Sequence, residues 1–168
     1  MNTKEENRIY KKELTKRNFR YNRYLLLRYS LAVLFFSNVY WGLALYLDKS
    51  IYLLLPLSLM MLAIMAISEH VKLYGANENE LPKLQWNLYY HFCQLGINIL
   101  LLALTIFNFN FTELFPVLTN SPEAKLAITA ILLMGVVISV CCLKRVFNIN
   151  RNKDKHYQYI IEFESAYK

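Results

Sequence analysis

The sequence predicts an all-α integral membrane protein, a bundle of four transmembrane helices with both termini in the cytoplasm. Two observations lead to this fold class. Of the 168 residues, 56% are hydrophobic and only 18% are charged. The charged residues are also unevenly distributed, because they leave four uncharged stretches of at least 18 residues. Since about 20 apolar residues are enough for a helix to cross the hydrocarbon core of a bilayer, four such stretches predict four spans.

The four spans follow from the residues between successive charges. The first two uncharged stretches contain 19 residues each, the third 29 and the fourth 18. A soluble core helix rarely stays uncharged over such a length, and the apolar part of a signal peptide is shorter. We expect the transmembrane helices at roughly 26–47, 51–69, 88–110 and 126–144.

The basic residues predict the orientation in the membrane. With four spans, 17 of the 19 Lys and Arg residues lie on the side that holds both termini. The positive-inside rule places that side in the cytoplasm. We therefore expect a multi-pass plasma-membrane protein with a basic, aromatic arm at 1–25, the bundle at 26–144 and a cytoplasmic tail at 145–168. The abundance of Asn, Lys, Ile, Tyr and Phe is typical of a low-GC bacterial genome.

The third predicted helix has a polar face. Five polar residues recur at steps of three, four or seven, which places them on one side of a helix: His91, Gln94, Asn98, Thr105 and Asn108. Because hydrocarbon satisfies no polar side chain, this face is expected to point into the bundle or toward a partner. Ser37 and Asn38 on the first helix are candidate contacts. The face has three interpretations: hydrogen bonding between helices, recognition of another membrane protein, or a substrate or ion path.

The two cytoplasmic segments combine basic and aromatic residues. Such a helix can lie on an anionic membrane surface or bind a partner protein. In the tail, apolar residues alternate with other residues, which is weakly typical of a strand, whereas a helical or disordered tail on the membrane is the alternative. The candidate partner contacts in both segments are Arg17, Arg20, Tyr21, Tyr157, Tyr159, Ile161 and Phe163.

We expect no catalytic site, cofactor or metal. The sequence has no phosphate-binding loop, dinucleotide fingerprint or hydrolase motif. His91, Cys93 and the pair Cys141 and Cys142 match no zinc spacing. Direct nucleic-acid binding is not expected, because no helix-turn-helix or other reading motif is visible.

The leading functional hypothesis is a small bacterial accessory membrane protein that binds a cytoplasmic or membrane partner and modulates or sequesters it. A membrane-tethered inhibitor of a transcription regulator is one example. The alternative is a self-immunity protein against a membrane-active toxin or bacteriocin, and the third hypothesis is a small transporter or channel subunit. The expected partners are the lipid bilayer and a protein, with a homo-oligomer as a further alternative.

Overall fold

The computed structural model describes residues 3–75 and 83–165, and within these ranges the chain contains helices and no strand. The elements, in order, are α1 (Thr3–Leu47), the 3₁₀ helix η1 (Ile51–Leu53), α2 (Leu54–Gly75), α3 (Gln85–Ile106), α4 (Phe111–Leu114), α5 (Pro122–Asn150) and α6 (Lys155–Ser165).

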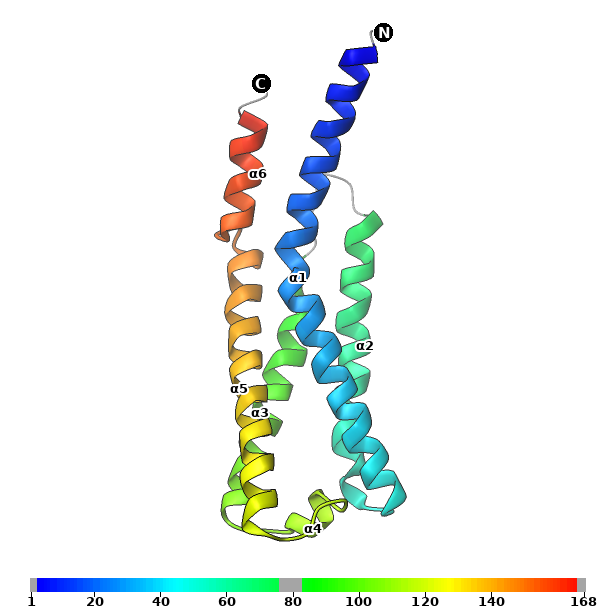
Figure 1. The fold of residues 1–168 in the computed structure, drawn as a ribbon, viewed down its shortest axis with the longest axis vertical. Coiled ribbons are helices and arrows are strands. Elements are labelled where there is room, and N and C mark those ends of the chain that lie inside the picture. The colour runs from blue at the N-terminus through cyan, green and yellow to red at the C-terminus, as the bar shows by residue number, and fades with distance from the viewer. Residues whose placement is uncertain (1–2, 76–82, 166–168) are drawn as a thin grey trace.

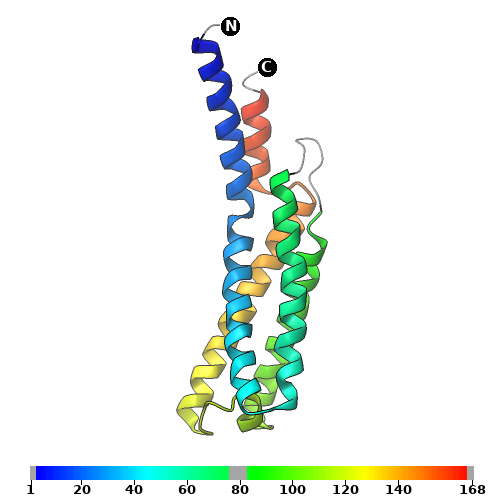
Figure 2. The same ribbon diagram turned by 90° about the vertical axis from the view of Figure 1, so that its right-hand side faces the viewer.

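Four long helices, α1, α2, α3 and α5, form the body of the molecule (Figure 1). Both termini lie at one end, here called the termini end, and the α1–α2 turn lies with α4 at the opposite turn end (Figures 1 and 2). Four helical segments are long and apolar enough to cross a membrane, as in a multi-pass membrane protein: Tyr21–Leu47, Ile51–Leu73, Gln85–Ile106 and one within Pro122–Phe163. The predicted number of apolar helices is therefore confirmed.

Several predicted helix boundaries need correction. The second helix continues past 69 to Gly75, and the fourth continues past 144 to Asn150. The third helix ends at Ile106 instead of 110, because Asn108 adopts a left-handed conformation with φ 55° and Asn110 does the same with φ 48°. Asn accepts this conformation more readily than most residues, but an α-helix cannot continue through it. The fourth helix begins earlier than 126, at Pro122, because Ser121 caps it by accepting a hydrogen bond from Ala124 N at 3.2 Å.

Helix α1 joins the predicted N-terminal arm and the first span in one continuous helix. Its 45 residues correspond to about 68 Å, more than twice the ~30 Å hydrocarbon core. No Gly or Pro occurs before Gly42, so no residue interrupts the helix on the way. The arm therefore continues along the direction of the bundle (Figure 1).

The strand-like interpretation of the tail is wrong, because the tail forms helix α6. Tyr157, Ile160 and Phe163 recur at a spacing of three, which also places them on one helical face. This face packs against α1: Ile160 is buried, and the rings of Phe163 and Phe19 meet edge to face at 5.9 Å. Figures 1 and 2 both show α6 beside the first part of α1. Residues 3–24 of α1 and the whole of α6 are called the two-helix arm below.

The segment between α3 and α5 is folded against the turn end. Phe111, Leu114 and Phe115 are buried there together with Leu101 and Leu132. Two hydrogen bonds attach the segment to the region after α1: Asn110 Nδ2 donates to the Tyr52 hydroxyl at 2.8 Å, and Ser50 Oγ donates to the Glu113 carbonyl at 3.1 Å.

The outer surface of the bundle is apolar on all four long helices. Tyr40 on α1, Met61 on α2, Ile106 on α3 and Leu126 on α5 are each at least 70% exposed. A water-soluble domain rarely shows so much contiguous apolar surface, whereas a lipid-facing surface requires it. Inside, Ala63 and Ala66 of α2 are fully buried next to Leu31 and Leu34 of α1. Small residues allow two helices to approach closely.

The close approach of α1 and α2 predicts that Ala63→Leu is destabilising. The larger side chain would overpack the interface and lower the free energy of unfolding by about 1–3 kcal/mol. Thermal unfolding of the purified protein in mild detergent measures the effect. Ile64→Leu is the matched control, because Ile64 is exposed and its replacement is expected to leave the melting temperature unchanged. Equal melting temperatures for both variants would contradict this packing.

Candidate functional site

Two buried polar assemblies stand out in the structure. The first is a row of three carboxamides, Asn38, Gln94 and Asn98, in the middle of the bundle. The second is the ion pair between Arg23 and Asp154 at the termini end. They are called the carboxamide row and the arm clamp.

The carboxamide row runs head to tail from α1 to α3. Asn38 Nδ2 donates to Gln94 Oε1 at 2.9 Å, and Gln94 Nε2 donates to Asn98 Oδ1 at 3.1 Å. The Tyr90 hydroxyl also donates to Gln94 Oε1, at 3.3 Å. All three carboxamides are buried, as polar groups that pair inside an apolar bundle should be. Gln94 and Asn98 are four residues apart, so one face of α3 presents both.

A glycine on α5 makes room for the end of the row. A Cβ atom placed on Gly135 would lie only 2.5 Å from Asn98 Nδ2. The Asn98 amide therefore rests directly against the α5 backbone, and a larger residue at 135 would displace it.

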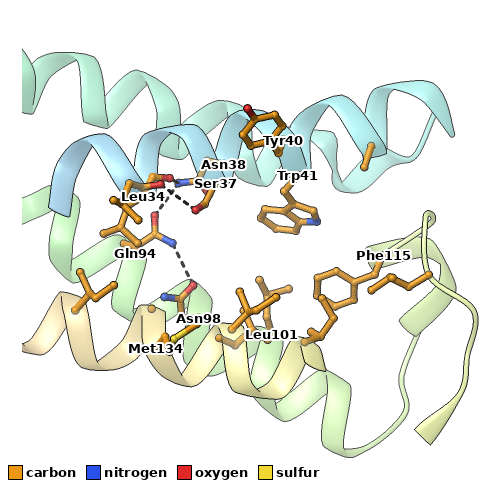
Figure 3. Close-up of a pocket in the computed structure, with 18 of the residues that line it drawn as sticks. Leu34, Ser37, Asn38, Tyr40, Trp41, Gln94, Asn98, Leu101, Phe115 and Met134 are labelled. Carbon is orange, nitrogen blue, oxygen red and sulfur yellow. Dashed lines mark hydrogen bonds between the residues drawn. The ribbon is translucent and has the colours of Figure 1, made fainter. Parts of the chain in front are cut away.

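A pocket of about 400 Å³ lies beside the row, between α1, α3 and α5. Figure 3 shows the three carboxamides at one end of it and Trp41 and Phe115 at the other. The indole of Trp41 stacks on Phe115 with ring centroids 6.3 Å apart and donates to the Leu114 carbonyl at 2.9 Å. The described residues that line the pocket are mostly apolar, and none of them is charged. The pocket lies where α1 and α5 separate, since these two helices contact each other much less than α3 and α5 do.

The arm clamp connects α1 to the start of α6. Arg23 Nε lies 3.1 and 3.0 Å from the two carboxylate oxygens of Asp154, and Arg23 Nη2 lies 2.7 Å from Oδ1. Arg23 Nη2 also donates to the Ile149 carbonyl and to Asn152 Oδ1, at 3.1 and 2.9 Å. The guanidinium carbon lies 5.0 Å from the centre of the Tyr157 ring. Both charged side chains are at most 1% exposed.

The local sequence explains how Asp154 reaches this position. Helix α5 ends at Asn150, and Asn152 adopts a left-handed conformation with φ 52°, which separates α5 from α6. Asp154 then caps α6 by accepting a hydrogen bond from Tyr157 N at 3.2 Å. One carboxylate therefore starts the last helix and neutralises Arg23. Sequence reasoning missed both residues of the clamp. The available signal was that Asp154 is the single acidic residue among the basic residues of 151–155.

A third polar contact holds the beginning of α3. Leu84, the residue before α3, makes no capping hydrogen bond with its side chain. Glu69 of α2 caps the helix instead. The Glu69 carboxylate accepts from Trp86 N at 2.8 Å and from Asn87 N at 3.0 Å. A negative charge at this helix end also matches the helix dipole. Asn87 is buried and contacts His70 Nε2 through Oδ1 at 3.0 Å.

The predicted polar face of the third helix divides into separate environments. His91 is fully buried, and neither of its ring nitrogens has a hydrogen-bond partner within the described part of the chain. Thr105 donates to the Leu101 carbonyl of its own helix at 2.8 Å. Ser37 is exposed and bonds to Val33 of α1. The placement of Asn108 on this face is wrong, because it lies beyond the end of α3 in a left-handed conformation and is exposed.

The predicted contacts on the arm also divide. Tyr21, Tyr159 and Ile161 are exposed. Tyr157 and Phe163 are partly buried because they contact Arg23 and Phe19. The side chains of Arg17 and Arg20 lie outside the part of the chain that the structure describes.

Neither sequence nor structural comparison assigns the chain to a family. No protein-family model, curated protein or solved structure matches it. Among the residues described, no three His, Cys, Asp or Glu side chains are grouped so that they would hold a metal ion.

The arm clamp predicts a large effect of Asp154→Asn. This variant keeps a good helix cap but removes the charge, which leaves Arg23 buried without its counter-ion. Stability is expected to fall by about 3–5 kcal/mol, and α6 to become accessible to protease. Limited proteolysis with mass spectrometry, together with thermal unfolding, measures both effects. Lys153→Ala, at an exposed neighbour, is the control and is expected to behave as wild type. An unchanged digestion pattern for Asp154→Asn would contradict the clamp.

The carboxamide row predicts a smaller effect of Asn98→Leu. The change leaves Gln94 Nε2 without its acceptor but makes the span more apolar, so we expect normal membrane insertion and a loss of about 1 kcal/mol. Expression level, membrane fractionation and thermal unfolding in detergent test this. Ile99→Leu, on the exposed face next to it, should change none of the three. A loss of insertion in Asn98→Leu would show that the row has a different role.

Proposed function

We propose that this chain is a small bacterial accessory membrane protein that binds a cytoplasmic partner protein through its two-helix arm and modulates or sequesters it. In this proposal the termini end faces the cytoplasm of the cell and the turn end faces outward. The concentration of Lys and Arg near the termini supports this orientation through the positive-inside rule.

The observation that carries the proposal is the arm clamp. Burial of an Arg and an Asp has a large desolvation cost, which close ion pairing and further hydrogen bonds offset. A tail that only stops translocation needs no such contact. The clamp instead holds α6 against α1, so that the arm presents one defined surface.

The exposed side of the arm has the composition of a binding surface. Tyr10, Leu14 and Tyr21 are exposed on α1, and Tyr159 and Ile161 are exposed on α6. Tyr is enriched in protein interfaces, where its ring gives contact area and its hydroxyl gives a hydrogen bond. The excess of basic residues in this part of the sequence favours an acidic partner surface.

The direction of the arm favours a protein partner over the membrane surface. Adhesion to a bilayer requires a helix that lies in the plane of the interface. Figures 1 and 2 show the arm continuing along the length of the bundle instead. A helix in this direction projects away from the bilayer, into the space where a soluble regulator would be bound.

Photocrosslinking in living cells tests the proposal. The photoreactive residue p-benzoylphenylalanine replaces Tyr21 or Tyr159 on the arm, or Tyr46 near the turn end as an exposed control. We expect a discrete adduct with one cytoplasmic protein from both arm positions and none from Tyr46. The adduct should disappear in the Asp154→Asn background, where the arm surface is no longer held.

Two results would overturn the proposal. The first is the absence of any discrete adduct from Tyr21 and Tyr159. The second is a specific adduct from Tyr46 alone with a secreted peptide or toxin, which would favour the self-immunity hypothesis.

A further inference from the structure

The carboxamide row ends on a hydrogen-bond donor that has no acceptor in the described structure. Asn38 donates to Gln94 and Gln94 donates to Asn98, so the Asn98 oxygen is used but its amide nitrogen is not. Asn98 is only 5% exposed, and it lines the pocket. An acceptor inside the pocket would give this donor the hydrogen bond that the protein does not provide.

The position of this donor excludes an ordinary lipid chain as its partner. Asn98 lies eight residues before the end of α3 at Ile106, which is about 12 Å at 1.5 Å per residue. Lipid ester oxygens lie at the membrane interface, so an acyl chain would reach this depth with methylene groups only. With the end of α3 at the membrane interface, an acceptor for Asn98 would come from a molecule that carries an oxygen deep in the bilayer.

The walls of the pocket restrict the ligand further. A volume of about 400 Å³ falls in the range of small-molecule sites, about 300–1,000 Å³. None of the described lining residues is charged, so a charged ligand would stay unpaired inside hydrocarbon at a high cost. Trp41 and Phe115 form an aromatic wall at the far end (Figure 3).

We propose that the pocket between α1, α3 and α5 binds an uncharged, mostly apolar small molecule whose carbonyl or hydroxyl oxygen accepts a hydrogen bond from Asn98 Nδ2. Gly135 makes this possible, because the absence of a Cβ leaves space for the amide. The proposal concerns the membrane-spanning half of the molecule and does not depend on the function of the arm.

Benzophenone is a suitable probe, because it is uncharged and apolar, has one carbonyl acceptor, and attaches to nearby C–H groups under ultraviolet light. The full chain in lipid nanodiscs is irradiated with increasing benzophenone, and the adducts are mapped by mass spectrometry. We expect saturable labelling at buried lining residues such as Leu101 and Leu132. Diphenylmethane, which has the same rings but no oxygen, should compete about fivefold less well, as expected for one hydrogen bond.

Three variants identify the donor and the cavity. Asn98→Leu, combined with Gln94→Leu so that Gln94 Nε2 is not left as a free donor beside the pocket, should raise the half-saturating benzophenone concentration about fivefold. Competition by diphenylmethane should stay unchanged. Ala44→Phe adds a ring to the pocket wall and should abolish saturable labelling while the row stays intact. Thr105→Val is the matched control, since Thr105 is also a buried polar residue of α3 but does not line the pocket.

Several outcomes would overturn the proposal. Labelling that never saturates and is spread over lipid-facing residues would show that the pocket holds lipid chains only. Saturable labelling that the double variant and Thr105→Val affect equally would remove the role of the Asn98 donor. If the double variant fails to fold, the wild-type comparison still decides, because equal affinities for benzophenone and diphenylmethane would exclude the hydrogen bond.

Discussion

The need to satisfy buried polar groups without water shapes this molecule from one end to the other. In the apolar interior of a bundle a polar side chain without a partner is costly, so most of the buried polar groups described above pair with the protein itself, although His91 does not. At the start of α3, the carboxylate of Glu69 on α2 accepts hydrogen bonds from backbone amides in the first turn. In the middle of the bundle, Asn38 Nδ2 of α1 donates a hydrogen bond to Gln94 Oε1 of α3. At the termini end, Asp154 neutralises Arg23.

Helix α1 takes part in most of this organisation. It contributes Arg23 to the clamp, Asn38 to the row and Trp41 to the pocket wall. Because it is continuous from Thr3 to Leu47, the proposed ligand pocket and the proposed partner surface share one rigid element. Its contacts differ along its length: it packs closely on α2 through Ala63 and Ala66, and it separates from α5 at the pocket.

The two proposals use different chemistry in different surroundings. The arm presents exposed tyrosines in a basic stretch of chain, which suits a protein surface reached through water. The pocket presents one amide donor among apolar walls, which suits a neutral molecule reached through the bilayer. Each proposal is tested by a different measurement, so a negative result for one does not affect the other.

The sequence by itself determined the number of helices that are long and apolar enough to cross a membrane, because the length of an uncharged stretch is a local property with a direct physical meaning in a bilayer. The same local reasoning put Gln94 and Asn98 together, since residues four apart share a helical face. It failed for Asn108, where left-handed backbone ends the helix. It left the tail open between a strand, a helix and disorder, and contact with α1 selects the helix. Only the tertiary structure decided the clamp and the end of the row. Arg23 and Asp154 are 131 residues apart in the sequence. The space that the Asn98 amide occupies exists because Gly135, on another helix, has no Cβ atom. Such pairings arise from how helices pack, and the periodicity of a single helix carries no information about its neighbour.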